Sequence, residues 1–320
     1  MKLNPKIMLF IRTVISILLI WWIVQSDKLN WNNIKIGVLN YKLALIFFVL
    51  TFLQLLIVSY RTQVLTQLTK NSPLEYKKIL SVSWGSLFLN CIVPTSVIGD
   101  IFRIKKFMNM DSLTQKDNFI YSSIFSKFFS VLSLALISMA SGLFIMEKIP
   151  ALRTFIICSY LVLIALIGLF YVRNIIFSKM SSCFIPLPRF ASRDFIKRRI
   201  ANFKIFTLGI IQDRKIWIKT LACSLLIQIL NTLSFVLIIY QLTPKSQVNI
   251  LELMCIVPVG IFLTNLPISY SGIGVGHVAF ASLLKIFDIP NGADVFTIFF
   301  AFSFIFDFCG IFFFIKHVKN

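Results

Sequence analysis

Long, uninterrupted apolar runs recur throughout this chain. A run of about twenty residues at roughly 1.5 Å per helical residue crosses a hydrocarbon layer of about 30 Å. We therefore predict an all-α, polytopic transmembrane helix bundle, with residues 1–320 forming a single integral membrane domain. The six predicted full spans are 7–24, 43–60, 119–146, 151–177, 216–240 and 295–316.

Two further pairs of apolar stretches are shorter, and each pair is interrupted by a proline and small residues. The first pair is 79–93 and 101–108, and the second is 251–266 and 275–287. Irregular backbone at membrane depth is tolerated where protein or water covers it, and matched interruptions in two halves of a chain are typical of transporters. The pattern predicts two re-entrant half-helix pairs between the full spans.

Composition and charge agree with a membrane protein. The chain is 58% hydrophobic with a mean hydropathy of +0.88, whereas soluble domains are about 45–50% apolar. Its net charge of +20 would suggest nucleic-acid binding in a soluble protein, but the positions of these charges indicate topology and contact with anionic lipid. We expect no nucleic-acid partner.

The distribution of basic residues predicts the orientation. With the N-terminus inside, 23 Lys and Arg residues fall on the cytoplasmic side and six on the opposite side. This bias predicts cytoplasmic N- and C-termini in the cell inner (cytoplasmic) membrane. The two half-helix pairs then enter from opposite faces, which suggests an inverted repeat.

One substantial loop, 178–215, interleaves basic and aromatic or aliphatic residues. Such spacing predicts a basic amphipathic helix at the cytoplasmic interface. Two interpretations stay open, namely a topological anchor and a surface that recruits anionic headgroups.

Ionisable residues inside the membrane are candidates for function because they are costly there. Asp100 and Arg103 are three residues apart on one helix face and can pair; the alternative is a wet interfacial position. Lys127 either neutralises a lipid phosphate or an acidic partner such as Asp100 or Asp307, or it extends to the interface. Asp307 has no polar neighbour in sequence, so we expect it to face the bundle interior.

The second half-helix pair carries a different candidate feature. Gly272 and Gly274 permit close backbone approach, and a helix that begins there directs free N–H groups and the positive dipole end into the membrane. Ser271 is a candidate cap or ligand contact, and His277 a candidate phosphate contact. The alternatives are glycines that serve packing alone and a histidine satisfied within the interior.

The sequence offers little support for enzymatic chemistry. It contains no Ser/His/Asp arrangement, H-E-x-x-H motif or Walker loop, and its six cysteines are scattered without a C-x-x-C pair. We therefore expect no catalytic residues, no metal site and no cofactor.

Two segments of the chain resemble the hallmark segments of a known family. The first covers Asn90 to Arg103 and reads N-C-I-V-P-T-S-V-I-G-D-I-F-R; the second covers Pro267 to Phe280 and reads P-I-S-Y-S-G-I-G-V-G-H-V-A-F. Both resemble the lysylphosphatidylglycerol synthase transmembrane-region family, also called flippase-like membrane proteins, over nearly the whole chain.

The match to the family motifs is close in the first segment and looser elsewhere. The family pattern of a proline, small residues and G-D-x-x-R is matched through Gly99, Asp100 and Arg103. The second family pattern reads G-G-x-G-x-R-E, or in some members ends in G-H. This chain has the G-H form, with Gly272, Gly274, Gly276 and His277 at the corresponding positions. Where many members have an acidic residue beside an arginine, this chain has Ser126 and Lys127.

The resemblance implies translocation of an anionic phospholipid or a prenyl-phosphate-linked precursor between leaflets. Bifunctional members carry a cytosolic aminoacyltransferase domain, and because this chain stops at Asn320 we expect no synthase activity. The implied headgroup cavity is lined by Asp100, Arg103, Lys127 and the half-helix from Gly272 to His277. The alternative is a non-transporting scaffold for a glycosyltransferase or lipid-modifying enzyme. The oligomeric state is open, a homo-oligomer included.

Overall fold

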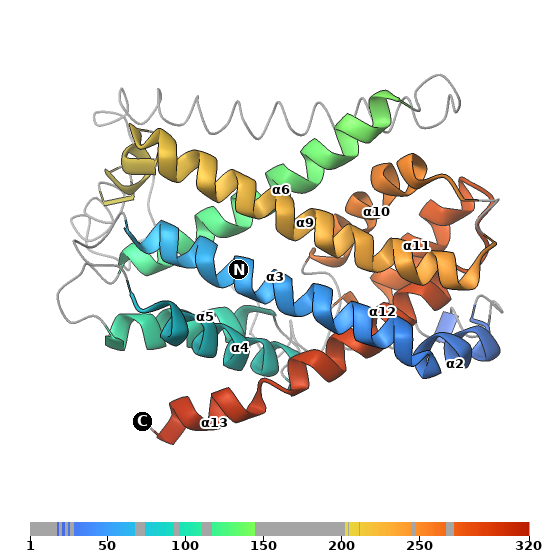
Figure 1. Ribbon diagram of the computed structural model, residues 1–320, viewed down its shortest axis with the longest axis horizontal. Helices are drawn as coiled ribbons and strands as arrows, with labels where there is room; N and C mark the ends of the chain where they lie inside the picture. Colours follow the sequence, from blue (N-terminus) through green and yellow to red (C-terminus); the bar gives the residue numbers. More distant parts are fainter. Residues whose placement is uncertain are drawn as a thin grey trace, which may run out of the picture.

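The computed structural model describes residues 29–67, 74–92, 96–110, 117–144, 205–210, 212–244, 248–266 and 272–319, together with Leu18, Trp21, Trp22, Gln25, Asn202 and Phe203. The regular elements within these ranges are helices, which confirms the all-α class (Figure 1). They are α2 (Trp31–Leu39), α3 (Tyr41–Gln67), α4 (Tyr76–Ile92), α5 (Ser96–Met110), α6 (Asp117–Leu143), α9 (Arg214–Leu242), α10 (Ile250–Thr264), α11 (Val275–Lys285), α12 (Gly292–Phe308) and α13 (Ile311–Lys319).

Four segments among the described residues are long and apolar enough to cross a membrane. They are α3, α6, α9 and the stretch Gly292–His317 formed by α12 and α13, and they correspond to four of the predicted spans. The predicted span 151–177 lies outside the described residues, as does most of 7–24. The prediction of six spans therefore stays a prediction.

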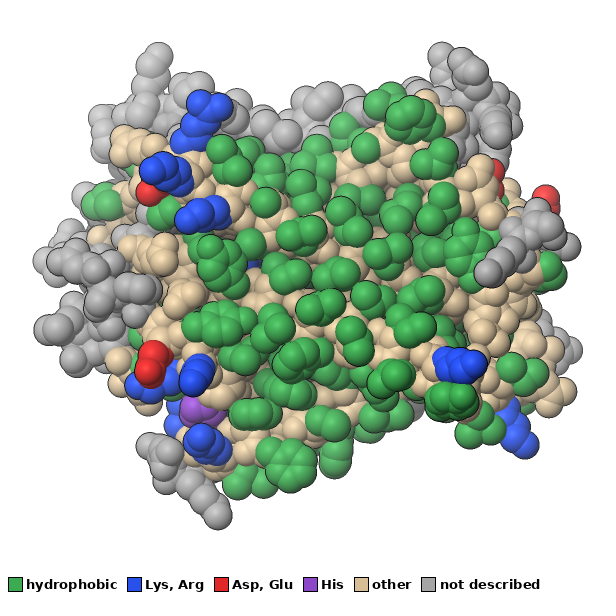
Figure 2. Space-filling model, in the orientation of Figure 1, with side chains coloured by type: hydrophobic (Ala, Val, Ile, Leu, Met, Phe, Trp, Pro, Cys, Tyr) green, Lys and Arg blue, Asp and Glu red, His purple; other side chains and the backbone are tan. Residues whose placement is uncertain are grey.

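The surface supports a membrane-spanning orientation along the long helices. Apolar side chains cover the middle of the face in Figure 2, and basic side chains gather towards its two ends, most densely at one of them. We call this the basic end; it is where α4, α6 and α9 begin and α13 finishes (Figure 1). Its exposed basic residues include Lys77, Lys78, Lys105, Arg214, Lys215, Lys219 and Lys316, whereas the opposite end has Lys35, Lys42 and Lys285.

Helices α4 and α5 form a hairpin that enters from the basic end (Figure 1). The Gly99 amide donates to Asn90 Oδ1 at 3.0 Å, which joins the inner parts of the two helices. Near the basic end, Ile79 and Phe107 share one apolar cluster. The two helices therefore run antiparallel, as the interrupted apolar pattern predicts.

Helices α10 and α11 form the corresponding hairpin at the opposite end (Figure 1). A Cβ atom at Gly272 would lie 3.0 Å from the Thr264 carbonyl oxygen, and one at Gly260 would lie 2.7 Å from the Phe280 ring. These pairs again place the two helices antiparallel. Because the hairpins enter from opposite ends, the arrangement fits the inverted repeat proposed from the charge pattern.

The α10–α11 hairpin is anchored in the largest apolar cluster of the described residues. Phe235 of α9 is stacked between Phe280 of α11 and Phe299 of α12, at ring-centroid distances of 4.4 Å and 3.9 Å. Stacked aromatic pairs add to the stability gained from area burial. The hairpin is thus fixed against two spans.

Three features differ from the sequence prediction. The span predicted at 295–316 is present as Gly292–His317, but it is divided at Cys309 and Gly310 into α12 and α13. At this break the backbone passes close to α4, since an added Cβ atom at Gly310 would overlap the Trp84 carbonyl oxygen. Helix α3 continues to Gln67, so Arg61 lies within a helix and not in the loop that was predicted to follow residue 60. The short helix α2 was not predicted; Asp294 accepts from its cap residue Asn30 at 2.8 Å.

Candidate functional site

The close contact of Gly99 with α4 fixes the position of Asp100, the next residue. The Gly99 amide donates to Asn90 Oδ1, and any Cβ atom at Gly99 would overlap Asn90 and the carbonyl oxygen of Ser86. Only glycine allows α4 and α5 to approach this closely. The G-D sequence therefore locks the hairpin and fixes the carboxylate beside it.

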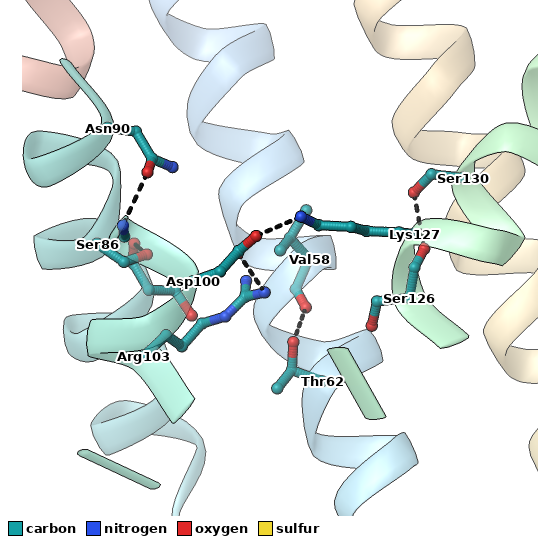
Figure 3. A network of polar contacts seen from close by, with 11 residues as sticks. Val58, Thr62, Ser86, Asn90, Asp100, Arg103, Ser126, Lys127 and Ser130 are labelled. Carbon is teal, nitrogen blue, oxygen red and sulfur yellow. Dashed lines mark hydrogen bonds and ion pairs between the residues drawn. The ribbon is translucent and has the colours of Figure 1, made fainter. Parts of the chain in front are cut away.

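Asp100 faces two cations from two different helices (Figure 3). Its Oδ1 accepts from Arg103 Nη2 at 3.1 Å, one turn further along α5, and its Oδ2 lies 2.5 Å from Lys127 Nζ of α6. Of the two acidic partners considered for Lys127, the structure shows Asp100. The three residues, which we call the charged cluster, connect the α4–α5 hairpin to a span.

The charged cluster has an excess of positive charge. One carboxylate faces two cations, and the side chains of Asp100 and Arg103 are only 19% and 15% exposed, while that of Lys127 is 61% exposed. Partial burial strengthens electrostatic interactions relative to bulk water. The surplus charge suits a monoanionic ligand that approaches from the exposed side of Lys127.

A narrow pocket with both polar and apolar side chains in its lining lies beside the charged cluster, between α3, α5 and α6. Arg103 lines it together with hydroxyl groups of α3 and α6, and its volume of about 10 Å³ is roughly the room for one water. The hydroxyl-bearing residues are Thr62, Thr66, Ser122, Ser123 and Ser126. The described pocket therefore has space for solvent or a single small polar group beside the guanidinium.

Arg61 is a buried cation that the sequence analysis did not single out. Its side chain is 6% exposed on α3, and its Nη1 donates to Ser130 Oγ of α6 at 2.9 Å and Ser224 Oγ of α9 at 2.8 Å. A signal existed in the sequence, because apolar residues continue on both sides of Arg61 at helical spacing. Because the predicted span ended at residue 60, Arg61 was assigned to the loop that follows it.

The glycines of the second hairpin serve a backbone role. Gly272 and Gly274 have φ values of 78° and 84°, which side-chain-bearing residues rarely adopt. The Gly274 amide donates to His277 Nδ1 at 3.2 Å across the first turn of α11. The sequence thus places glycine where the chain must turn into the helix.

His277 has protein partners at both ring nitrogens. Because Nδ1 accepts from Gly274, the ring proton resides on Nε2, which donates to Thr297 Oγ1 at 3.1 Å; that hydroxyl donates to the Ala293 carbonyl at 2.9 Å. The ring is 9% exposed. This geometry fits the interior histidine considered as the alternative, and it leaves no ring nitrogen directed at a ligand.

The remaining candidates are Asp307 and Ser271. Asp307 is on α12, and its carboxylate makes no hydrogen bond or ion pair within the described part of the chain. Ser271 lies outside the described residues. Helix α5 packs on α4 and α6, whereas α11 packs on α10 and α12. No hydrogen bond or ion pair among the described residues joins the charged cluster to Gly272, Gly274 or His277, so a single cavity that contains both stays a prediction.

Fold and site together define a polytopic helical membrane protein with two oppositely directed hairpins and a partly buried, net-positive cluster. The family model of the lysylphosphatidylglycerol synthase TM region matches residues 9–312. The chain belongs to this family, which is associated with lipid handling. Searches of curated proteins and of solved structures found no match.

Proposed function

We propose that this protein moves an anionic phospholipid or a lipid-linked phosphate precursor between leaflets, and that Asp100, Arg103 and Lys127 receive the headgroup. The observation that carries the proposal is the convergence of two cations on one carboxylate across α5 and α6. A phosphodiester brings the negative charge that this cluster lacks. Its acyl or prenyl chains would stay in the surrounding lipid.

The hairpin arrangement supports transport. Hairpins that enter from opposite ends are characteristic of transporters in which the site becomes accessible from each side in turn. The charged cluster is built on one of these hairpins, so a movement of α4 and α5 relative to α6 would change the access of a headgroup to Arg103 and Lys127. Asp100 competes with the headgroup for the same cations, which favours release after binding.

The proposed orientation places the basic end in the cytoplasm of a cell whose inner membrane holds the protein. The positive-inside bias supports this assignment, because Lys and Arg residues are more abundant at that end. The headgroup site then opens first to the cytoplasmic leaflet, which is the leaflet from which newly made lipid would be taken.

The test is leaflet translocation in proteoliposomes. Labelled phosphatidylglycerol and a prenyl-phosphate lipid are followed with the wild-type protein, with Arg103→Ala and with Lys77→Ala. Lys77 is an exposed cation of α4 that makes no ion pair among the described residues, so it controls for loss of charge. We expect movement of at least one lipid that Arg103→Ala abolishes and Lys77→Ala retains. The proposal is contradicted if neither lipid moves, or if all three proteins move lipid at equal rates.

A further inference from the structure

The charge of Arg61 has no counter-ion within the described part of the chain. Its hydrogen bonds go to two neutral serine hydroxyls, and its Nε atom is buried without a partner. An isolated buried charge is expensive, and proteins normally neutralise it with a carboxylate or a bound ion.

The helices around Arg61 contribute further polar atoms that lack partners. Along α9, Thr220, Ser224 and Gln228 are spaced four apart and therefore lie on one face, and all three are buried. Thr220 Oγ1 and Gln228 Oε1 make no hydrogen bond, although the residue between them binds Arg61. Buried polar atoms without partners are rare and call for an explanation such as a ligand.

These polar groups are continuous with the charged cluster. Ser130, which accepts from Arg61, donates in turn to the Ser126 carbonyl at 3.0 Å, and Lys127 follows Ser126 on α6 (Figure 3). Thr62, the next residue after Arg61 on α3, lines the pocket beside Arg103. Ser130, which accepts from Arg61, thus lies one helical turn of α6 from Lys127 of the proposed headgroup site.

We propose that Arg61 is a second binding group for the phosphate of the transported lipid, reached from the charged cluster and flanked by the polar face of α9. This inference rests on the proposed function and adds a residue to it. A guanidinium whose Nη1 is held by two serines keeps further N–H groups for a phosphate oxygen. The phosphodiester provides the missing counter-charge.

The experiment is a binding titration that does not depend on transport. Purified protein in neutral detergent is titrated with phosphatidylglycerol, with phosphatidylcholine of the same acyl chains and with inorganic phosphate, while the melting temperature is followed. The variants are Arg61→Gln, Arg61→Lys and the control Lys219→Gln, which removes an exposed cation of α9. Helicity and gel-filtration behaviour verify folding.

We expect phosphatidylglycerol to bind the wild-type protein more tightly than phosphatidylcholine. Arg61→Gln should weaken the binding of phosphatidylglycerol by about tenfold or more; Arg61→Lys should weaken it less, and Lys219→Gln should leave it unchanged. Equal phosphatidylglycerol affinities of folded Arg61→Gln and wild type would overturn the inference and leave the proposed function standing. No preference of the wild type for phosphatidylglycerol would also overturn the inference, whereas the proposed function would fall only if the proteoliposome assay showed no movement of the prenyl-phosphate lipid either. A response to inorganic phosphate alone would overturn the assignment to lipid.

A purely structural role for Arg61 predicts a different pattern. The double variant Ser130→Ala/Ser224→Ala removes both acceptors of Nη1 but keeps the charge. If Arg61 only joins three helices, this variant and Arg61→Gln should lower the melting temperature alike and leave phosphatidylglycerol affinity unchanged. We expect instead that the serine variant retains most of the affinity that Arg61→Gln loses.

Discussion

Lys127 of α6 and Asp100 of α5 form an ion pair in which Nζ and Oδ2 are 2.5 Å apart. The pair connects the first turns of α5, in the α4–α5 hairpin, to the membrane span α6. The same carboxylate holds Arg103 at 3.1 Å through its other oxygen. An incoming phosphate must compete with Asp100 for both cations. The carboxylate therefore sets how tightly an anion is held and how readily it leaves.

Removal of the Asp100 charge should tighten binding and slow release. In Asp100→Asn, Arg103 and Lys127 lose their counter-charge, and a unit charge about 4 Å away in a water-like dielectric contributes about 1 kcal/mol, or roughly fivefold in affinity. We expect phosphatidylglycerol to bind about fivefold more tightly and to cross between leaflets more slowly. Titration and the proteoliposome assay measure the two effects. Weaker binding by a folded Asp100→Asn protein would show that the carboxylate contacts the ligand favourably.

A side chain at Gly99 should separate α4 from α5. Gly99→Ala brings a Cβ atom into overlap with the Ser86 carbonyl and the Asn90 side chain, and we expect a loss of about 1–3 kcal/mol in stability from this overpacking. Thermal unfolding in detergent measures it. Lipid movement should fall too, because the carboxylate of Asp100 shifts with the hairpin.

Gly85→Ala is the matched comparison on α4. There the added Cβ would lie 3.1 Å from the Phe314 amide nitrogen, a tight contact without overlap. We expect a smaller decrease in melting temperature than for Gly99→Ala, and unchanged phosphatidylglycerol affinity. A larger effect at Gly85 would mean that the contact of α4 with α13 matters more than the hairpin.

His277 should tolerate glutamine better than alanine. The imidazole accepts from the Gly274 amide and donates to Thr297, and a glutamine three residues after a helix cap can form the same backbone bond. We expect His277→Ala to cost about 1–3 kcal/mol, since it leaves a buried amide unsatisfied, and His277→Gln to retain stability and lipid movement. Full loss of movement in a stable His277→Gln protein would instead assign the ring a role in transport.

Asp294 should hold α2 against the start of α12. Its Oδ1 accepts from the Asn30 amide at 2.8 Å and its Oδ2 from Asn33 Nδ2 at 3.1 Å. We expect Asp294→Ala to increase hydrogen exchange of residues 31–39 at least about tenfold, since each lost bond to a charged group contributes about 1.5–3 kcal/mol. Asn33→Ala keeps the bond to Asn30 and should have a smaller effect. Equal exchange in both variants would show that α2 is held by its apolar contacts.

The orientation is tested with single cysteines at the two ends. In a protein whose native cysteines are replaced, an impermeant maleimide applied to intact cells should label Lys35→Cys. Lys215→Cys should react only after the cells are permeabilised, because it lies in the first turn of α9, which begins at the basic end. The reverse pattern would place the N-terminus and the charged cluster on the outer side.

Hydropathy and local residue spacing were enough to predict the class of protein and its main elements. Apolar runs of span length have one stable environment, so α3, α6 and α9 follow from hydropathy alone. The prolines and glycines between short apolar runs indicated both hairpins, and the G-D-x-x-R spacing placed Asp100 and Arg103 on one face of α5, since residues three apart on a helix are neighbours. These features are local, so they can be read from neighbouring positions.

Contacts between residues far apart in the sequence depend on how the helices pack. Lys127 could pair with either of two aspartates, and only the packing of α5 against α6 selects Asp100. Two roles for His277 were open in the sequence, and the hydrogen bond between its second nitrogen and Thr297 of α12, which fits the interior role, depends on helix packing. Arg61 became a candidate because α3, α6 and α9 bury it together. Burial and electrostatic surroundings are set by helices far apart in the chain, and a pattern along one helix does not contain them.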